Sequence, residues 1–162
     1  MPWPDSARYE LRHGEVVRLP PPKFSHMEIQ ENLRRLLDAA AAGPGRVYIE
    51  FAFRPKGERD YRVADVAYAT KEHRARTNRE SYFEGSPELV AEILSPSNTA
   101  VEIADKRAIC FETGSREFWV IDPKRRQIEV FTGAASQVYK PGESIQPHFG
   151  GGIQVDAVFD NA

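Results

Sequence analysis

The chain has 162 residues, of which 41% are hydrophobic and 28% are charged, and its formal net charge is −2. This length and balance predict one domain over residues 1–162 with a substantial core. The charge excludes a generally basic surface, so a nucleic-acid binder of this composition needs its basic residues gathered on one face.

No apolar run has membrane-spanning length, and the first residues lack the basic and apolar regions of a signal peptide. The single cysteine, Cys110, cannot form an internal disulfide, which is typical of a reducing compartment. We therefore expect a cytoplasmic protein without membrane contacts.

The N-terminal segment predicts a β-hairpin. Short apolar stretches flank Arg12-His13-Gly14, and the second one ends at Pro20-Pro21-Pro22, where three successive residues lack a backbone donor. His13 lies at the turn of this hairpin and is expected to be exposed.

A helix is predicted to follow, beginning at Ser25 and closed by Gly43-Pro44. Ser25 and Glu28 match a capping box, and Phe24 with Ile29 matches a hydrophobic staple. The apolar stripe of this helix comprises Ile29, Leu33, Leu36, Leu37 and Ala40.

Helical spacing separates the polar residues at the start of this helix. At about 100° per residue, His26 and Gln30 border the apolar stripe, whereas Glu28 points away from it. Glu28 is therefore interpreted as a cap. His26 can face a cleft, although a histidine at a helix start is more often only a first-turn residue.

Residues 46–54 alternate between apolar and polar positions, which predicts a half-buried strand. Its apolar face is expected to carry Val47, Ile49, Phe51 and Phe53. Glu50, on the other face, is a candidate third carboxylate, but a solvated or arginine-paired residue is the favoured interpretation. The turn at 56–60 then predicts a hairpin with the next strand.

Segment 71–85 is polar and basic and predicts a loop or a short helix. Among local surfaces it is the best suited to phosphate contacts, although a charge run is more often only a solvated face.

Two apolar segments, 61–68 and 88–94, each contain one carboxylate, Asp65 and Glu92, where a buried strand normally has a hydrophobic residue. An unpaired ionised carboxylate in a strand interior is costly, so each is expected to have a cation or a donor partner. Two such groups on neighbouring strands repel each other, and a divalent cation relieves that repulsion. Asp65 and Glu92 are therefore the candidate active site.

A second helix is predicted to run to Thr113. Thr99 and Glu102 have capping-box spacing, and Asn98 is a competing cap. One apolar face comprises Val101, Ala104, Ala108 and Phe111.

Lys106 lies on a second arc of this helix, between Ile103 and Cys110. A lysine there usually extends its ammonium to solvent. The alternative is that the ammonium reaches the acidic pair at the end of the preceding strand.

The rest of the chain predicts mainly strands. Segments 117–121 and 127–131 are expected to form a third hairpin, 137–139 to add an edge strand, and apolar residues between 153 and 159 to dock the C-terminus.

Other site chemistries are poorly supported. No Cys/His cluster suits zinc, and no strand, glycine-rich loop and helix unit suits a nucleotide. Ser95 follows a strand but lacks the Gly-x-Ser-x-Gly elbow. The remaining candidates are Asp65, Glu92 and Lys106. The carboxylate oxygens of Asp65 and Glu92 are hard ligands that suit magnesium or manganese, and the ammonium of Lys106 suits an anion that develops during a reaction.

A resemblance to a known family is carried by three segments: Glu88-Leu89-Val90-Ala91-Glu92-Ile93-Leu94-Ser95-Pro96-Ser97-Asn98, Arg62-Val63-Ala64-Asp65-Val66-Ala67, and Phe118-Trp119-Val120-Ile121-Asp122-Pro123. They are similar to the Uma-type family of restriction endonucleases, within the PD-(D/E)XK nuclease superfamily. The similarity also takes in the opening hairpin, the start of the first helix and the second helix, so it covers nearly the whole chain.

This resemblance implies an α+β restriction-endonuclease-like fold, with a mixed central sheet flanked by helices and with peripheral hairpins. It implies that Asp65 and Glu92 are the two metal-binding acids and that the backbone carbonyl of Ile93 is a third ligand. The usual lysine position is Leu94, but related families supply the lysine from the following helix, where Lys106 lies. Two further departures are Ala64 in place of the usual proline and Cys110 in place of a common tyrosine.

The expected function is Mg²⁺- or Mn²⁺-dependent hydrolysis of DNA phosphodiester bonds. Asp65 and Glu92 would hold the metal, Lys106 would orient water or stabilise charge, and His26, Gln30 and Glu50 are secondary candidates. The alternatives are a non-catalytic interaction module with the nuclease fold and a metal hydrolase acting on a small phosphoester. A homodimer is the common solution for duplex cleavage.

Overall fold

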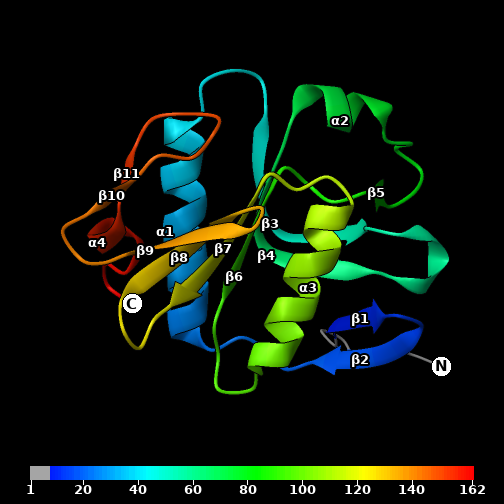
Figure 1. Ribbon diagram of the computed structural model, residues 1–162, viewed down its shortest axis with the longest axis horizontal. Helices are drawn as coiled ribbons and strands as arrows, with labels where there is room; N and C mark the ends of the chain where they lie inside the picture. The colour runs from blue at the N-terminus through cyan, green and yellow to red at the C-terminus, as the bar shows by residue number, and fades with distance from the viewer. Residues whose placement is uncertain (1–7) are drawn as a thin grey trace.

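A mixed seven-stranded sheet forms the centre of the computed structural model, which describes residues 8–162 (Figure 1). The strand order is β5-β3-β4-β6-β7-β8-β9, and the β3/β5 and β6/β7 pairs are parallel. The strands are β3 Arg46–Arg54, β4 Arg62–Ala69, β5 Phe83–Glu84, β6 Leu89–Ile93, β7 Glu117–Asp122, β8 Gln127–Thr132 and β9 Ala135–Tyr139. The expected mixed sheet, the β3–β4 and β7–β8 hairpins and the β9 edge strand are confirmed.

Two long helices cover opposite faces of this sheet, α1 on one side and α3 on the other (Figure 1). The helices are α1 Phe24–Ala40, α2 Lys71–Arg76, α3 Ala100–Glu112 and α4 Val155–Val158. Two small antiparallel hairpins lie outside the sheet, β1 Arg8–Arg12 with β2 Glu15–Leu19, and β10 Ser144–Ile145 with β11 Ile153–Gln154. Within residues 8–162, no helix is long and apolar enough to cross a membrane.

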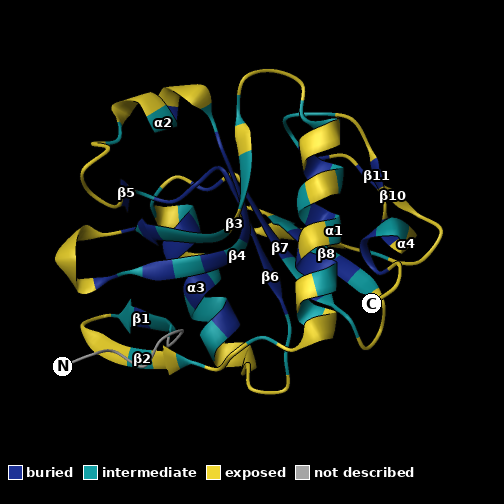
Figure 2. Ribbon diagram, turned by 180° about the vertical axis from the view of Figure 1, so that it is seen from behind, coloured by how far each residue is buried: buried dark blue, intermediate teal, exposed yellow. Residues whose placement is uncertain are grey.

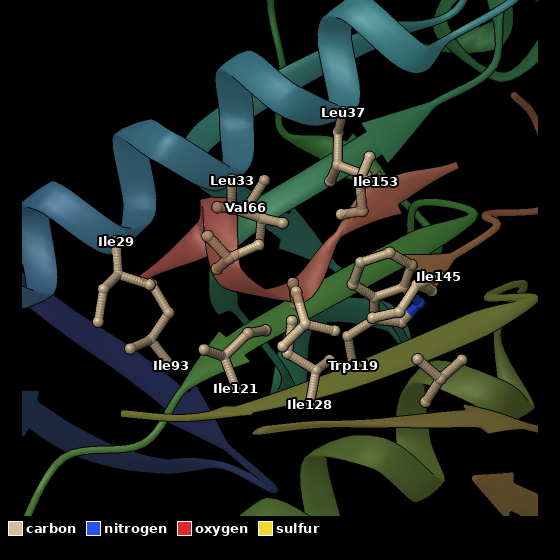
Figure 3. Close-up of a cluster of buried hydrophobic side chains, with 14 of the residues drawn as sticks. Ile29, Leu33, Leu37, Val66, Ile93, Trp119, Ile121, Ile128, Ile145 and Ile153 are labelled. Atoms are coloured by element: carbon tan, nitrogen blue, oxygen red, sulfur yellow. The ribbon is translucent and has the colours of Figure 1, made fainter. Parts of the chain in front are cut away.

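The larger core lies between α1 and the sheet, whose central strands β6 and β7 are almost entirely buried (Figure 2). The predicted stripe of α1 packs here, with Ile29, Leu33 and Leu37 at most 2% exposed (Figure 3). Residues from β7, β8 and the C-terminal segment complete this layer, among them Trp119, Ile121, Ile128, Ile145 and Ile153. Each such side chain contributes about 1.5–3 kcal/mol when fully buried, so this face fixes the position of α1 on the sheet.

The α3 face of the sheet is packed differently from the prediction. The helix buries Ile103, Lys106, Ile109 and Cys110, whereas Val101, on the arc expected to be buried, is 78% exposed. The hydrogen bonds made by Lys106 to the sheet explain this rotation, because they require its arc to face inward.

The two predicted capping boxes had different outcomes. At α3, Thr99 Oγ1 accepts the backbone N–H of Glu102 at 3.1 Å, as expected, while Asn98 accepts the N–H of Ser95 instead. At α1, the prediction was wrong: the N-cap is Lys23, it makes no side-chain cap bond, and Phe24 is 74% exposed. Because α1 begins at Phe24, Ser25 already lies inside the first turn and cannot cap it.

The alternation of β3 and β4 changes phase at one point. Val47 packs on the α1 face, but Phe51 and Phe53 pack on the α3 face, so the predicted single apolar face is wrong. The change occurs at Glu50, whose backbone φ of 49° is in the left-handed region. Such strain in a residue other than glycine is held by its surroundings and clusters at functional sites. The pairs on either side place Glu50 opposite Asp65 in β4.

Candidate active site

Asp65 and Glu92 lie opposite each other where the ladder between β4 and β6 stops. The last pair is Val66 with Ala91, and beyond it side chains replace backbone acceptors. The Asp65 N–H donates to Glu92 Oε2 at 3.0 Å, and the Ile93 N–H donates to Asp65 Oδ2 at 2.8 Å. Each carboxylate therefore satisfies a backbone donor on the other strand, which holds the two acids side by side.

Lys106 reaches this pair from α3. Its Nζ donates to Glu92 Oε1 at 2.5 Å, to Val63 O at 2.7 Å and to Glu10 Oε2 at 2.8 Å. The side chain is only 7% exposed, so the alternative in which the lysine extends to solvent is wrong. These three acceptors match the three N–H groups of an ammonium.

Burial and charge act in opposite directions on the ionisation of this cluster. Burial raises the pKa of Glu92 to about 7; the Lys106 ammonium opposes this shift, whereas the charges of Asp65 and Glu10 add to it. Burial would also raise the pKa of Glu10, but Lys106, the Val63 N–H and Arg12 together lower it to about 2. For Lys106, burial alone lowers the pKa, but the two glutamates raise it above its ordinary value. The lysine is thus held as a cation between two acids.

The start of α1 supplies polar groups to the other side of Asp65. Gln30 Nε2 donates to the Asp65 carbonyl at 2.8 Å and to Glu50 Oε1 at 3.0 Å. His26 Nε2 lies 3.4 Å from Asp65 Oδ2. Burial alone would lower the pKa of His26, but the bond to Asp65 and the charges of Asp65 and Glu50 raise it. Glu50 pairs with Arg8, which confirms the favoured arginine-paired interpretation.

One pocket of about 270 Å³ has His26, Asp65, Glu92, Ile93 and Lys106 in its wall, whereas Gln30 and Glu50 do not line it. Glu28 does not line it either, in agreement with its outward direction on the helix. An adjoining groove of about 530 Å³ shares Lys23, His26 and Ser95 with this pocket. The pocket and the groove are therefore neighbours, with the start of α1 between them.

The oxygen donors of the pocket fit a hard divalent cation. Asp65 and Glu92 offer carboxylates, and the carbonyl of Ile93 lies on the same strand end. Within residues 8–162, no three His, Cys, Asp or Glu side chains are grouped as metal ligands. Mg²⁺ commonly uses one or two carboxylates and retains several waters, so this small donor set suits it better than zinc. The metal and the ligand roles remain predictions.

Glu10 is the member of the cluster that the sequence analysis did not single out. Its side chain is 1% exposed, and it lies in β1 between Tyr9 and Leu11. The criterion that identified Asp65 and Glu92, a carboxylate within an apolar strand segment, also applies to Glu10. The strand is only five residues long and was predicted as part of a peripheral hairpin, so Glu10 was not considered as a site residue.

The basic segment 71–85 lies away from this pocket. Its helix α2 follows the end of β4, where Tyr68 pairs with Leu89 at the start of β6, whereas Glu92 is near the end of β6. Figure 1 shows α2 at the top and the β1–β2 hairpin at the bottom of the same side of the molecule. Arg74 there bonds to Tyr48 and to the carbonyl of Pro44. Any phosphate contacts made by this segment would therefore lie away from Asp65 and Glu92.

Together, the mixed sheet between helices and the acid pair with its lysine define a nuclease-like class of protein. Residues 1–157 match the model of the Uma2 family, which is described as "Putative restriction endonuclease". The chain belongs to this family, and the predicted resemblance is confirmed. No curated protein matches the chain.

A solved structure from Anabaena variabilis ATCC 29413, described as "a putative nuclease belonging to DUF820", is similar to this chain. The TM-score is 0.81 at 18% sequence identity, over 98% of this chain and 93% of that chain. At this identity the likeness establishes the shared fold. The restriction-endonuclease-like α+β architecture is thereby confirmed.

Proposed function

We propose that this protein is a metal-dependent endonuclease that hydrolyses DNA phosphodiester bonds. The observation that carries the proposal is the meeting of Asp65, Glu92 and Lys106 in one pocket, from three different elements. Membership of a family described as restriction endonucleases adds the substrate class.

In this proposal, Asp65, Glu92 and the Ile93 carbonyl hold Mg²⁺ or Mn²⁺. A bound divalent ion polarises a phosphoryl oxygen and lowers the pKa of a coordinated water. Lys106 presents positive charge to the oxygens of the reacting phosphate, where charge builds in the transition state. His26, whose Nε2 lies 3.4 Å from Asp65 Oδ2, keeps that carboxylate turned toward the pocket, or orients the attacking water.

A non-catalytic interaction module would not explain why the charges of Glu10, Glu92 and Lys106 are buried together. Replacing a buried ion pair by packed apolar side chains is often neutral or stabilising, so such a cluster is weak evidence for a stabilising role. Glu92 and Lys106 are both less than 10% exposed, yet both lie in the wall of a pocket that solvent can enter. A site that performs chemistry accounts for this arrangement better than a scaffold does.

Basic residues beside the pocket favour a polyanionic substrate despite the net charge of −2. The adjoining groove has Lys23, Lys124 and Arg125 on its wall. Arg125 is paired with Asp122 in the same wall, so Lys23 and Lys124 are the groups that support a polyanionic substrate here.

The test is incubation of supercoiled plasmid with the protein in Mg²⁺, in Mn²⁺ and in excess chelator. Nicking is expected with either metal, absent with chelator and absent in Asp65→Asn. A matched control is Asp38→Asn, an exposed carboxylate on α1. Metal-independent nicking, or nicking by Asp65→Asn at the wild-type rate, would refute the proposal.

A salt titration of DNA affinity separates the nuclease from the other two classes. Contacts with phosphates release counterions, so the affinity of a nuclease falls steeply as salt rises. An interaction module or a small-phosphoester hydrolase is expected to show no such slope for DNA.

A further inference from the structure

Hydrogen bonds connect Glu10, Asp65, Glu92 and Lys106 into one cluster. Of its three carboxylates, Glu10 is the one that has no proposed part in holding the metal. Its two oxygens accept three hydrogen bonds, from Lys106 Nζ at 2.8 Å, from the Val63 N–H at 2.9 Å and from Arg12 Nε at 2.9 Å. It comes from β1, outside the central sheet, and lies in the wall of the same pocket as Asp65 and Glu92.

All three donors of the Lys106 ammonium are engaged, by Glu10, Glu92 and Val63. To contact a phosphate or a water, the ammonium must give up one of these acceptors. If Glu92 also bound a cation, its negative charge would be shared between that cation and the ammonium, so the bond that Lys106 donates to Glu92 would weaken first. The bonds to Glu10 and Val63 then determine where the freed N–H points.

We propose that Glu10 is a positioning residue that anchors the Lys106 ammonium and directs its free N–H toward the substrate. This inference rests on the proposed nuclease function. Val63 supports the same geometry twice, since its carbonyl accepts from Lys106 and its N–H donates to Glu10. Glu10, Val63 and Lys106 thus form a closed ring of hydrogen bonds, which restricts the ammonium more than one contact would.

The hairpin that carries Glu10 is fastened to the rest of the protein by several other contacts. Leu11 and Tyr61 exchange two backbone hydrogen bonds of 2.8 Å, and His13 Nε2 lies 2.8 Å from Asp105 Oδ1 on α3. A change at Glu10 therefore leaves the hairpin in place, and the effects of a loose hairpin can be measured separately through His13. The His13 side chain is 59% exposed, as expected for the turn.

The first measurement is hydrogen exchange of the lysine ammonium groups by ¹⁵N NMR on the metal-free protein. The chain has six lysines, and the five other than Lys106 are exposed. Only the Lys106 ammonium is expected to exchange slowly, and its signal is assigned by its loss in Lys106→Met. In Glu10→Gln the signal should broaden or disappear, whereas in His13→Asn it should persist. A signal of wild-type sharpness in Glu10→Gln would overturn the inference.

The second measurement is cleavage kinetics with the same variants. For Glu10→Gln, kcat should fall about 100-fold, the effect expected of a misplaced catalytic group, with KM for DNA and metal affinity unchanged. His13→Asn should cleave at the wild-type rate. Equal kcat in Glu10→Gln and wild type would overturn the inference while leaving the nuclease function intact. A wild type that cleaves nothing refutes the function, and the NMR result then still decides whether Glu10 holds the ammonium.

Glu10→Asp covers the case in which Glu10→Gln does not fold. It keeps the buried charge but withdraws the carboxylate by one methylene. Faster ammonium exchange and a lower kcat than wild type are expected, and wild-type values for both would refute the anchor.

Discussion

Glu92 accepts the backbone N–H of Asp65 at 3.0 Å, at the position where β4 and β6 stop pairing through their backbones. The carboxylates of Asp65 and Glu92 thus take the place of backbone acceptors in the hydrogen bonding of the sheet. A conformational change that separated them would leave buried backbone donors without partners, which is costly. The pocket is therefore pre-organised by the same bonds that close the sheet.

The first prediction concerns metal binding by this pair. Asp65→Asn keeps an acceptor for the Ile93 N–H but removes one negative charge from the pocket, so affinity for Mn²⁺ should fall at least about tenfold. Calorimetric titration of wild type, Asp65→Asn and the exposed control Asp38→Asn measures this. Equal binding in all three proteins would remove Asp65 from the site.

The second prediction concerns stability without metal. Glu92→Gln should stay within about 1 kcal/mol of wild type, because Lys106 keeps Glu10 as a partner and like-charge repulsion with Asp65 is relieved. Leu33→Ala should cost about 2–5 kcal/mol, since Leu33 is fully buried against the sheet.

Urea unfolding of both variants makes this comparison. A Glu92→Gln variant as unstable as Leu33→Ala would identify Glu92 as a structural ion-pair member instead of a functional acid.

Much of this architecture follows from local pattern. The stripe of α1, the alternation of the hairpins and the Thr99 cap are determined by neighbours in sequence, and each predicted its element. Asp65 and Glu92 could be found because a charge in an apolar strand is conspicuous in the sequence itself.

The rest depends on contacts that sequence spacing does not encode. The rotation of α3 is set by Lys106 bonding to Glu10 and Val63, residues far from it in the chain. The change of phase in β3 comes from the left-handed backbone of Glu50, which a regular alternation cannot predict. Glu10 was missed because it lies in a short strand of a peripheral hairpin, and its bond with Lys106 forms only when that hairpin docks beside α3.

The third prediction uses the two predicted helix caps as a matched pair. Thr99→Ala removes a side-chain acceptor from the Glu102 N–H and should destabilise the protein by about 1 kcal/mol. Ser25→Ala should change stability by less than about 0.5 kcal/mol, because α1 has no side-chain cap to lose. Chemical denaturation decides this, and equal losses in the two variants would contradict the cap assignment.

The fourth prediction concerns pH. His73 Nδ1 lies 2.7 Å from Glu88 Oε2 and Nε2 lies 2.7 Å from the Glu84 carbonyl. Neither acceptor carries a proton when Glu88 is ionised, so both ring nitrogens must donate and the imidazole is cationic. Burial alone would lower the pKa of His73, but these two bonds raise it above 6.5.

Because the folded pKa of His73 is raised, its stabilisation is complete below pH 6.5 and is lost as pH rises through the folded pKa. For Glu88, burial alone would raise the pKa, but His73 and the Thr70 N–H lower it below 4.5. Its stabilisation is therefore complete above pH 4.5 and is lost as pH falls through that lower pKa. The pair should stabilise most between these limits.

Urea unfolding from pH 5 to pH 9 compares wild type with His73→Gln. The stability advantage of wild type should shrink on the alkaline side. A constant difference across this range would show that His73 is neutral in the folded protein.

The most direct test of the catalytic assignment is the initial rate of Mn²⁺-dependent plasmid nicking by Lys106→Met, measured beside Lys140→Met, which changes an exposed lysine. Circular dichroism first confirms that both variants are folded, and calorimetry confirms that both bind the metal. Because Lys106 is proposed to stabilise charge in the transition state, its loss should lower the rate by about 100-fold or more, while Lys140→Met nicks at the wild-type rate. Nicking by folded Lys106→Met at the wild-type rate would contradict the mechanism.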